Sequence, residues 1–207
     1  MRDTMPTPHA RTDFLLTGVG GQGTLLAADV VALVGVALGL DVKKSEIHGM
    51  AQRGGSVVSQ VRWGERVYSP VITPGEADVM VAFERLEGLR YADQVRPGGT
   101  VLVNDYRISP VSVSSGNDAY PTADEEAAAY AGHLAVEWVP ATEIAQGLGA
   151  ARVTNVVLLG ALSARLPVAP EVWLEVIGRR VPERFLALNR EAFAAGRAYL
   201  VKGGALE

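Results

Sequence analysis

The chain has 207 residues, of which 48% are hydrophobic and 20% charged, and its formal net charge is −4. This composition is that of a soluble globular protein with enough apolar side chains for a full core, and the lack of a basic cluster argues against nucleic acid as a ligand. The chain contains no cysteine, which excludes disulfides and any iron–sulfur cluster held by its own thiolates.

The amino-terminal residues 1–12 contain two prolines, mixed charge and no apolar block. We therefore expect a frayed tail, no secretory signal and a cytoplasmic protein. No later stretch approaches the roughly 20 consecutive apolar residues of a membrane-spanning helix. We expect no association with a membrane.

The first predicted unit is a buried strand followed by a helix. Residues 13–17 form a short apolar run, residues 18–23 are rich in glycine, and an Ala/Leu/Val-rich segment continues to about Leu38. Such a run suits a parallel strand covered on both faces. Gly39 is placed to end the helix, because helices commonly close with a glycine in the left-handed conformation.

The next segment predicts an antiparallel insertion. Residues 41–44 suit a short second strand, and residues 56–63 alternate between two faces with a period of two. Gly64–Glu65 then supplies a turn, and residues 66–69 are predicted to return as the second strand of a hairpin.

Strands and helices alternate through the remainder. Apolar strands are predicted at residues 78–83, 100–104 and 135–139, with helices after the first of them and after Thr122, which is placed as a helix cap. From Ala141 onward the pattern is helical, with breaks near residues 166–167 and 180–182. These elements predict one α/β domain over residues 13–201: a doubly wound, mostly parallel, Rossmann-like sheet with an antiparallel hairpin insertion and carboxyl-terminal helices.

The glycine-rich turn after the first strand fits the pattern G-x-G-x-x-G through Gly18, Gly20 and Gly23. These glycines permit a tight turn, close approach of a phosphate and close packing of helix on strand. A dinucleotide site also requires an acid at the end of the second strand. Asp41 falls at its start and Glu46 in a polar loop, so neither fits. A structural turn, a bound NAD or FAD, and another phosphate-bearing or protein partner remain open.

A second glycine-rich stretch, residues 45–55, joins a strand to the hairpin and carries polar side chains among its glycines. Loops of this composition often carry function on a rigid scaffold. His48 would titrate near neutral pH, and Arg53 offers a planar fork for a carboxylate or phosphate. The alternative is that both are ordinary surface groups.

Glu84, Glu87 and Arg90, after the strand at residues 78–83, lie at helical spacing and are expected to form exposed ion pairs.

Together the two glycine-rich segments resemble the gamma-domain family of 2-oxoacid:ferredoxin oxidoreductases. The supporting matches include Phe83–Glu84, Asn155 with residues 159–161, and Asn189 with Gly196, and the resemblance covers about residues 13–200. Within that family, the local sequence around His48 is most similar to an indolepyruvate-type branch, which implies an aryl 2-oxoacid as the substrate.

The resemblance implies a small subunit that holds no cofactor itself and is inactive alone. A large partner subunit would carry thiamine diphosphate, Mg²⁺ and iron–sulfur clusters, coenzyme A would accept the acyl group, and electrons would pass to ferredoxin. No residue is assigned as catalytic or metal-binding. The residues expected to line the approach of the 2-oxoacid or coenzyme A, or to contact the partner, are Gly18, Gly20, Gly21, Gln22, Gly23, His48, Gln52, Arg53 and Gly54.

Two alternatives stand beside this interpretation. A free-standing NAD- or FAD-dependent oxidoreductase would use the glycine fingerprint alone, without a convincing ribose acid. A nucleotide- or coenzyme A-binding module would have no enzymatic activity. Binding of NAD to the isolated chain would favour the first of these two.

Overall fold

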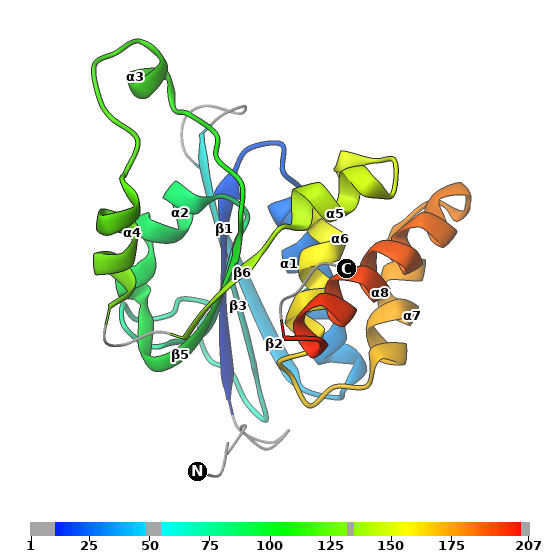
Figure 1. Ribbon diagram of the computed structural model, residues 1–207. Coiled ribbons are helices and arrows are strands. Elements are labelled where there is room, and N and C mark those ends of the chain that lie inside the picture. Colours follow the sequence, from blue (N-terminus) through cyan, green and yellow to red (C-terminus); the bar gives the residue numbers. More distant parts are fainter. Residues whose placement is uncertain (1–10, 49–54, 132–134, 204–207) are drawn as a thin grey trace.

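The computed structural model describes residues 11–48, 55–131 and 135–203, which form one twisted sheet with helices on both faces (Figure 1). The strand order is β2-β3-β1-β4-β5-β6. β1, β4, β5 and β6 are parallel, whereas β3 is antiparallel to both of its neighbours. The strands are β1 (Thr12–Val19), β2 (Asp41–His48), β3 (Ser56–Gly64), β4 (Ala77–Ala82), β5 (Val95–Asn104) and β6 (Ala135–Val139).

The helices divide between the two faces of the sheet (Figure 1). α2 (Arg85–Arg90) and α4 (Ala123–Tyr130) cover one face, and α3 (Val111–Ser114) belongs to an excursion beyond the sheet. The other face is covered by α1 (Thr24–Ala37), α5 (Ala141–Gly147), α6 (Thr154–Ser163), α7 (Pro170–Arg180) and α8 (Leu186–Val201). Short 3₁₀ turns lie at Ala92–Gln94, Ala151–Val153 and Glu183–Phe185. The predicted doubly wound class, with an antiparallel insertion and carboxyl-terminal helices, is confirmed.

Local end signals agree with the sequence. Gly39 adopts φ +78° just after α1, and the N–H of Leu40 donates to the carbonyl of Gly35. Thr122 caps α4 in a capping box: its side chain accepts from the N–H of Glu125, whose carboxylate accepts from the N–H of Thr122. The breaks predicted in the last third of the chain separate α6 from α7 and α7 from α8.

The antiparallel pair differs from the predicted hairpin. β3 pairs with β2 along one edge and with β1 along the other. Because both edges are taken, residues 66–69 cannot pair with β3, and the predicted turn at Gly64–Glu65 does not form a hairpin. The second strand is also longer than predicted, since it continues from Asp41 to His48.

Residues 66–71 are instead held by side chains against the end of the sheet where β1 and β2 begin. The Asp41 carboxylate accepts from the N–H of Val67 at 2.8 Å. Arg62 donates to the carbonyl of Val71 at 2.6 Å and forms a bidentate pair, at 2.9 Å for each bond, with the fully buried carboxylate of Asp13. Each charge of the pair compensates the other in the interior. Either charge buried without its partner would be strongly destabilising.

α6 and α8 cross at two glycines. A Cβ built on Gly160 would overlap the carbonyl oxygen of Phe193, and one built on Gly196 would overlap the carbonyl oxygen of Val157. Neither position can hold a larger residue unless the helices separate. This crossing buries the centre of the larger apolar cluster, which includes Leu158, Leu162 and Phe193.

We therefore expect Gly160→Ala to lower the free energy of unfolding by about 1–3 kcal/mol, because the added methyl group forces the two backbones apart. Gly178→Ala in α7 is the matched control, since its Cβ would meet Leu186 Cδ1 at 3.5 Å. That substitution should be neutral or stabilising by up to about 1 kcal/mol. Urea unfolding followed by circular dichroism measures both, and equal stabilities would contradict the packing argument.

Candidate functional site

The carboxyl ends of the parallel strands meet at the upper edge of the sheet in Figure 1. The helix after β1 covers one face, and the helix after its neighbour β4 covers the other. The connections therefore diverge between β1 and β4. Open α/β sheets bind ligands at such a switch point, and Gly18–Gly23 lies directly beside it.

The conformation of the glycine loop explains its glycines. A Cβ on Gly18 would lie 2.7 Å from Thr24 Oγ1 and 2.8 Å from Phe83 Cβ. Gly21 and Gly23 adopt φ +106° and +81°. Gly23 is the N-cap of α1, and no side-chain hydrogen bond caps this helix. The loop thus leaves the start of α1 free to face an anion.

Gln22 joins the loop to β4. Its Oε1 accepts from the N–H of Val19 at 2.7 Å, and its Nε2 donates to the carbonyl of Phe83 at 2.8 Å. Both ends of the amide are therefore engaged within the chain. Gln22, expected from the sequence to hydrogen-bond a ligand, spans the switch point and fixes the loop.

The described ends of the second glycine-rich segment lie beside this loop. His48 ends β2 and is the register partner of Val57, which in turn pairs with Gly18. At the other end the N–H of Gly20 donates to the carbonyl of Gly55 at 2.8 Å. The remaining predicted residues of this segment, Gln52, Arg53 and Gly54, lie outside the described residues.

Neither acid considered for a ribose fits a dinucleotide site. Asp41 lies at the start of β2, at the end of the sheet opposite the glycine loop. There its carboxylate accepts from Lys43 and from the N–H of Val67. Glu46 forms an ion pair with Lys44 at 2.5 Å. The structure therefore does not favour a bound NAD or FAD.

Two hollows flank the glycine loop. One, of about 300 Å³, is lined by loop glycines together with Thr24, Leu25 and Val57. The other, of about 480 Å³, lies between the loop, α5, the start of α6 and the segment that follows β5. Its polar lining consists of Gln22, Tyr106, Thr142, Gln146, Arg152, Thr154 and Asn155.

Most residues of the larger hollow carry no functional signal in the sequence. Arg152, whose guanidinium stacks 4.7 Å from the ring centre of Phe185, gives it a positive charge suited to a carboxylate or phosphate. Asn155 was noted only as a match to the family, and it lies against Gly23, to whose carbonyl it donates at 3.5 Å. Tyr106 and Arg152 sit in connections without a recognisable motif, so no sequence signal identified them.

Glu84 and Glu87 are buried, which corrects the expectation of exposed ion pairs. They are 1% and 3% exposed. Glu84 caps α2 by accepting from the N–H of Glu87 at 3.0 Å, and it also accepts from the N–H of Ile108 at 2.9 Å. Glu87 accepts from the hydroxyl of Ser56 at 2.5 Å and from Arg90 at 2.8 Å. Burial raises the pKa of Glu87 above its usual value.

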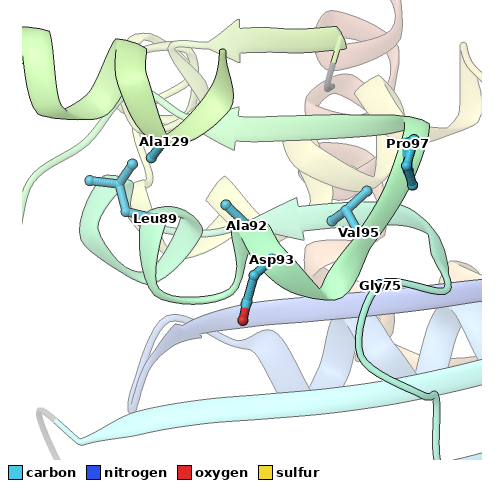
Figure 2. Close-up of a pocket in the computed structure, with 7 residues that line it drawn as sticks. All are labelled: Gly75, Leu89, Ala92, Asp93, Val95, Pro97 and Ala129. Carbon is cyan, nitrogen blue, oxygen red and sulfur yellow. The ribbon is translucent and has the colours of Figure 1, made fainter. Parts of the chain in front are cut away.

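A further hollow of about 450 Å³ lies away from this edge, near the amino ends of β4 and β5 (Figure 2). Its lining is Gly75, Leu89, Ala92, Asp93, Val95, Pro97 and Ala129, with Asp93 as the one charged member. None of the site residues predicted from the sequence lines it.

Within the described ranges, no cluster of three metal-binding side chains occurs. None of the helices in these ranges has the length and apolar character of a membrane span.

Comparisons with known proteins agree with the resemblance seen in the sequence. The family model for pyruvate ferredoxin/flavodoxin oxidoreductase matches residues 13–199. Indolepyruvate oxidoreductase subunit IorB from Thermococcus kodakarensis is 40% identical over 188 residues, covering 89% of this chain and 93% of the relative. The corresponding subunit from Archaeoglobus fulgidus is 38% identical over 200 residues, covering 93% and 97%.

Solved structures share the fold. The gamma subunit of a keto/oxoacid ferredoxin oxidoreductase from Geobacter sulfurreducens superposes with a TM-score of 0.69 at 25% identity, covering 93% of this chain and 99% of that subunit. A 2-oxoglutarate:ferredoxin oxidoreductase from Magnetococcus marinus gives a TM-score of 0.75 at 23% identity. There the match covers 93% of this chain but 31% of the longer one, so the same fold also occurs as one part of a larger polypeptide.

The buried carboxyl of Glu87 makes stability depend on pH in a defined direction. Its pKa lies above 4.5 in the folded chain, so the folded state binds this proton more tightly than the unfolded state. The contribution of Glu87 to the free energy of unfolding therefore falls as pH rises from about 4.5 through the raised pKa. Glu87→Gln does not titrate, and its stability relative to the parent chain should rise over the same interval. Urea unfolding of both proteins from pH 4.5 to neutrality measures the difference, and a constant difference would contradict the raised pKa.

Proposed function

We infer that this chain, which belongs to the pyruvate ferredoxin/flavodoxin oxidoreductase family, is the small subunit of an indolepyruvate-type 2-oxoacid:ferredoxin oxidoreductase. The observation that carries this inference is 35–40% identity to four indolepyruvate oxidoreductase IorB subunits, across 86–93% of the chain. The reaction is oxidative decarboxylation: the 2-oxoacid loses CO₂, its acyl group passes to the sulfur of coenzyme A, and two electrons pass to ferredoxin.

The cofactors of this reaction belong to a larger partner subunit. Iron–sulfur clusters require thiolate ligands, and this chain has no cysteine. Among the described residues, no group of three or more histidine, aspartate or glutamate side chains could hold a metal ion. We propose that this chain holds none of these cofactors and that its contribution is positional.

The carboxyl edge of the sheet is the surface proposed to meet substrate. The glycine loop presents the uncapped start of α1, and the neighbouring hollow carries Arg152. Both features favour an anion, and both 2-oxoacids and coenzyme A are anionic. We propose that residues 18–23 and the segment from His48 to Gly54 line the approach of one of these substrates and contact the partner subunit.

The two alternatives are less well supported. A dinucleotide-dependent oxidoreductase lacks its ribose acid, since Asp41 lies at the far edge of the sheet. A nucleotide-binding module without activity leaves the similarity to oxidoreductase subunits over nearly the whole chain without a role.

Purification of this chain from its native cell tests the proposal directly. We expect a brown complex containing a cysteine-rich, thiamine-containing partner, active on indolepyruvate with coenzyme A and ferredoxin. Absorbance, mass spectrometry and a ferredoxin-reduction assay make the measurement. A colourless chain that elutes alone with bound nicotinamide or flavin would overturn the proposal.

Substitutions in the assembled enzyme test the carboxyl edge separately. Gln22→Ala frees the loop from β4 and displaces its backbone N–H groups, and Arg53→Ala removes a guanidinium. Each should raise the KM of an anionic substrate by about tenfold, the size expected when hydrogen bonding to a charged group is lost. Arg179→Ala, which removes an exposed arginine paired with Glu175 on α7, is the matched control and should change neither KM. Unchanged KM values and undiminished subunit association in Gln22→Ala and Arg53→Ala would exclude this edge as the contact surface.

A further inference from the structure

One buried carboxylate lies behind the glycine loop rather than in it. Glu87, in the first turn of α2, is 3% exposed. Its Oε2 accepts from Ser56 Oγ at 2.5 Å, and its Oε1 accepts from Arg90 Nη1 at 2.8 Å. Removing a carboxylate from water is costly, so a buried one that persists needs such charge-assisted partners.

Ser56 connects this carboxylate to the loop. It is the first residue of β3 and the register partner of Val19, where β1 ends. The carbonyl of the preceding residue, Gly55, accepts the N–H of Gly20 at 2.8 Å. A displacement of Ser56 would therefore move the acceptor that holds the second glycine of the G-x-G-x-x-G pattern.

The backbone of Glu87 makes a second contact, directly with β1. The carbonyl of Glu87 accepts from the hydroxyl of Thr17 at 3.4 Å, and Thr17 immediately precedes Gly18. Figure 1 shows α2 packed beside the upper part of the sheet, where β1 ends. Glu87 thus holds both the strand that enters the loop and the strand that faces it.

We propose that Glu87 is a positioning residue for the reaction: through Ser56 and Gly55 it fixes the N–H of Gly20 and the glycine loop at the edge that meets substrate. This inference rests on the proposed function of that edge. Glu87 touches neither substrate nor cofactor in this role. Its effect is expected on substrate binding, because a displaced loop presents its backbone N–H groups in the wrong place.

The test uses Glu87→Ala, Ser56→Ala and the double variant in the assembled enzyme. Each single variant should raise the KM of the substrate that responds to Gln22→Ala by about tenfold, with kcat changed less than about twofold. The double variant should be no worse than the poorer single variant, because both remove the same hydrogen bond. Glu87→Gln should restore much of the loss, since its amide oxygen still accepts from Ser56.

Glu126→Ala is the control for a purely structural effect. Glu126 on α4 is also a buried carboxylate, 4% exposed, and it pairs with Arg85 of α2 at 3.1 Å. It should lower the thermal midpoint comparably but leave both KM values unchanged. If Glu87→Ala raises KM no more than Glu126→Ala while Gln22→Ala does raise it, the positioning role is wrong and the proposed function of the edge stands. If none of these variants changes KM, both proposals are overturned.

Discussion

The carboxyl edge of the sheet depends on the hydrogen bonds made by Phe83 and Glu84, the two residues that directly follow β4. The carbonyl of Phe83 accepts from Gln22 in the glycine loop at 2.8 Å and from Asn104 at the end of β5 at 3.0 Å. The carboxylate of Glu84 caps α2 and accepts from Tyr120 at 2.5 Å across the excursion that carries α3. Connections from three parallel strands are therefore joined at one point, and the geometry of each depends on the other two.

Features governed by local chemistry could be predicted from the sequence. The apolar strands at residues 78–83 and 135–139, the glycine that ends α1 and the cap at Thr122 all follow from interactions within a few residues. The glycine loop was found for the same reason, since the positive φ angles of Gly21 and Gly23 are a local requirement for glycine. The doubly wound class then followed from the alternation of elements.

Features governed by distant partners could not be predicted. Periodicity marked β3 as a strand but not that β1 and β2 occupy both of its edges, so residues 66–69 were wrongly assigned as its neighbour. Helical spacing suggested exposed ion pairs for Glu84 and Glu87 because spacing alone does not show which side chains reach a buried hydroxyl or N–H from a distant strand. Arg152 was missed since its place beside the glycine loop comes from packing of residues about 130 positions apart, as the contact between Gly23 and Asn155 shows.

The arrangement of charge at this edge favours an anionic ligand. The negative charges of Glu84 and Glu87 are buried and satisfied by N–H, hydroxyl and guanidinium donors. Among the groups that face the hollows, the uncapped start of α1 and the guanidinium of Arg152 carry partial or full positive charge. Anions are therefore favoured in front of the loop, while the acids behind it hold the loop in place. In the proposed complex, an edge of this kind would position an anionic substrate whose chemistry occurs on the partner subunit, so this chain could contribute through binding geometry alone.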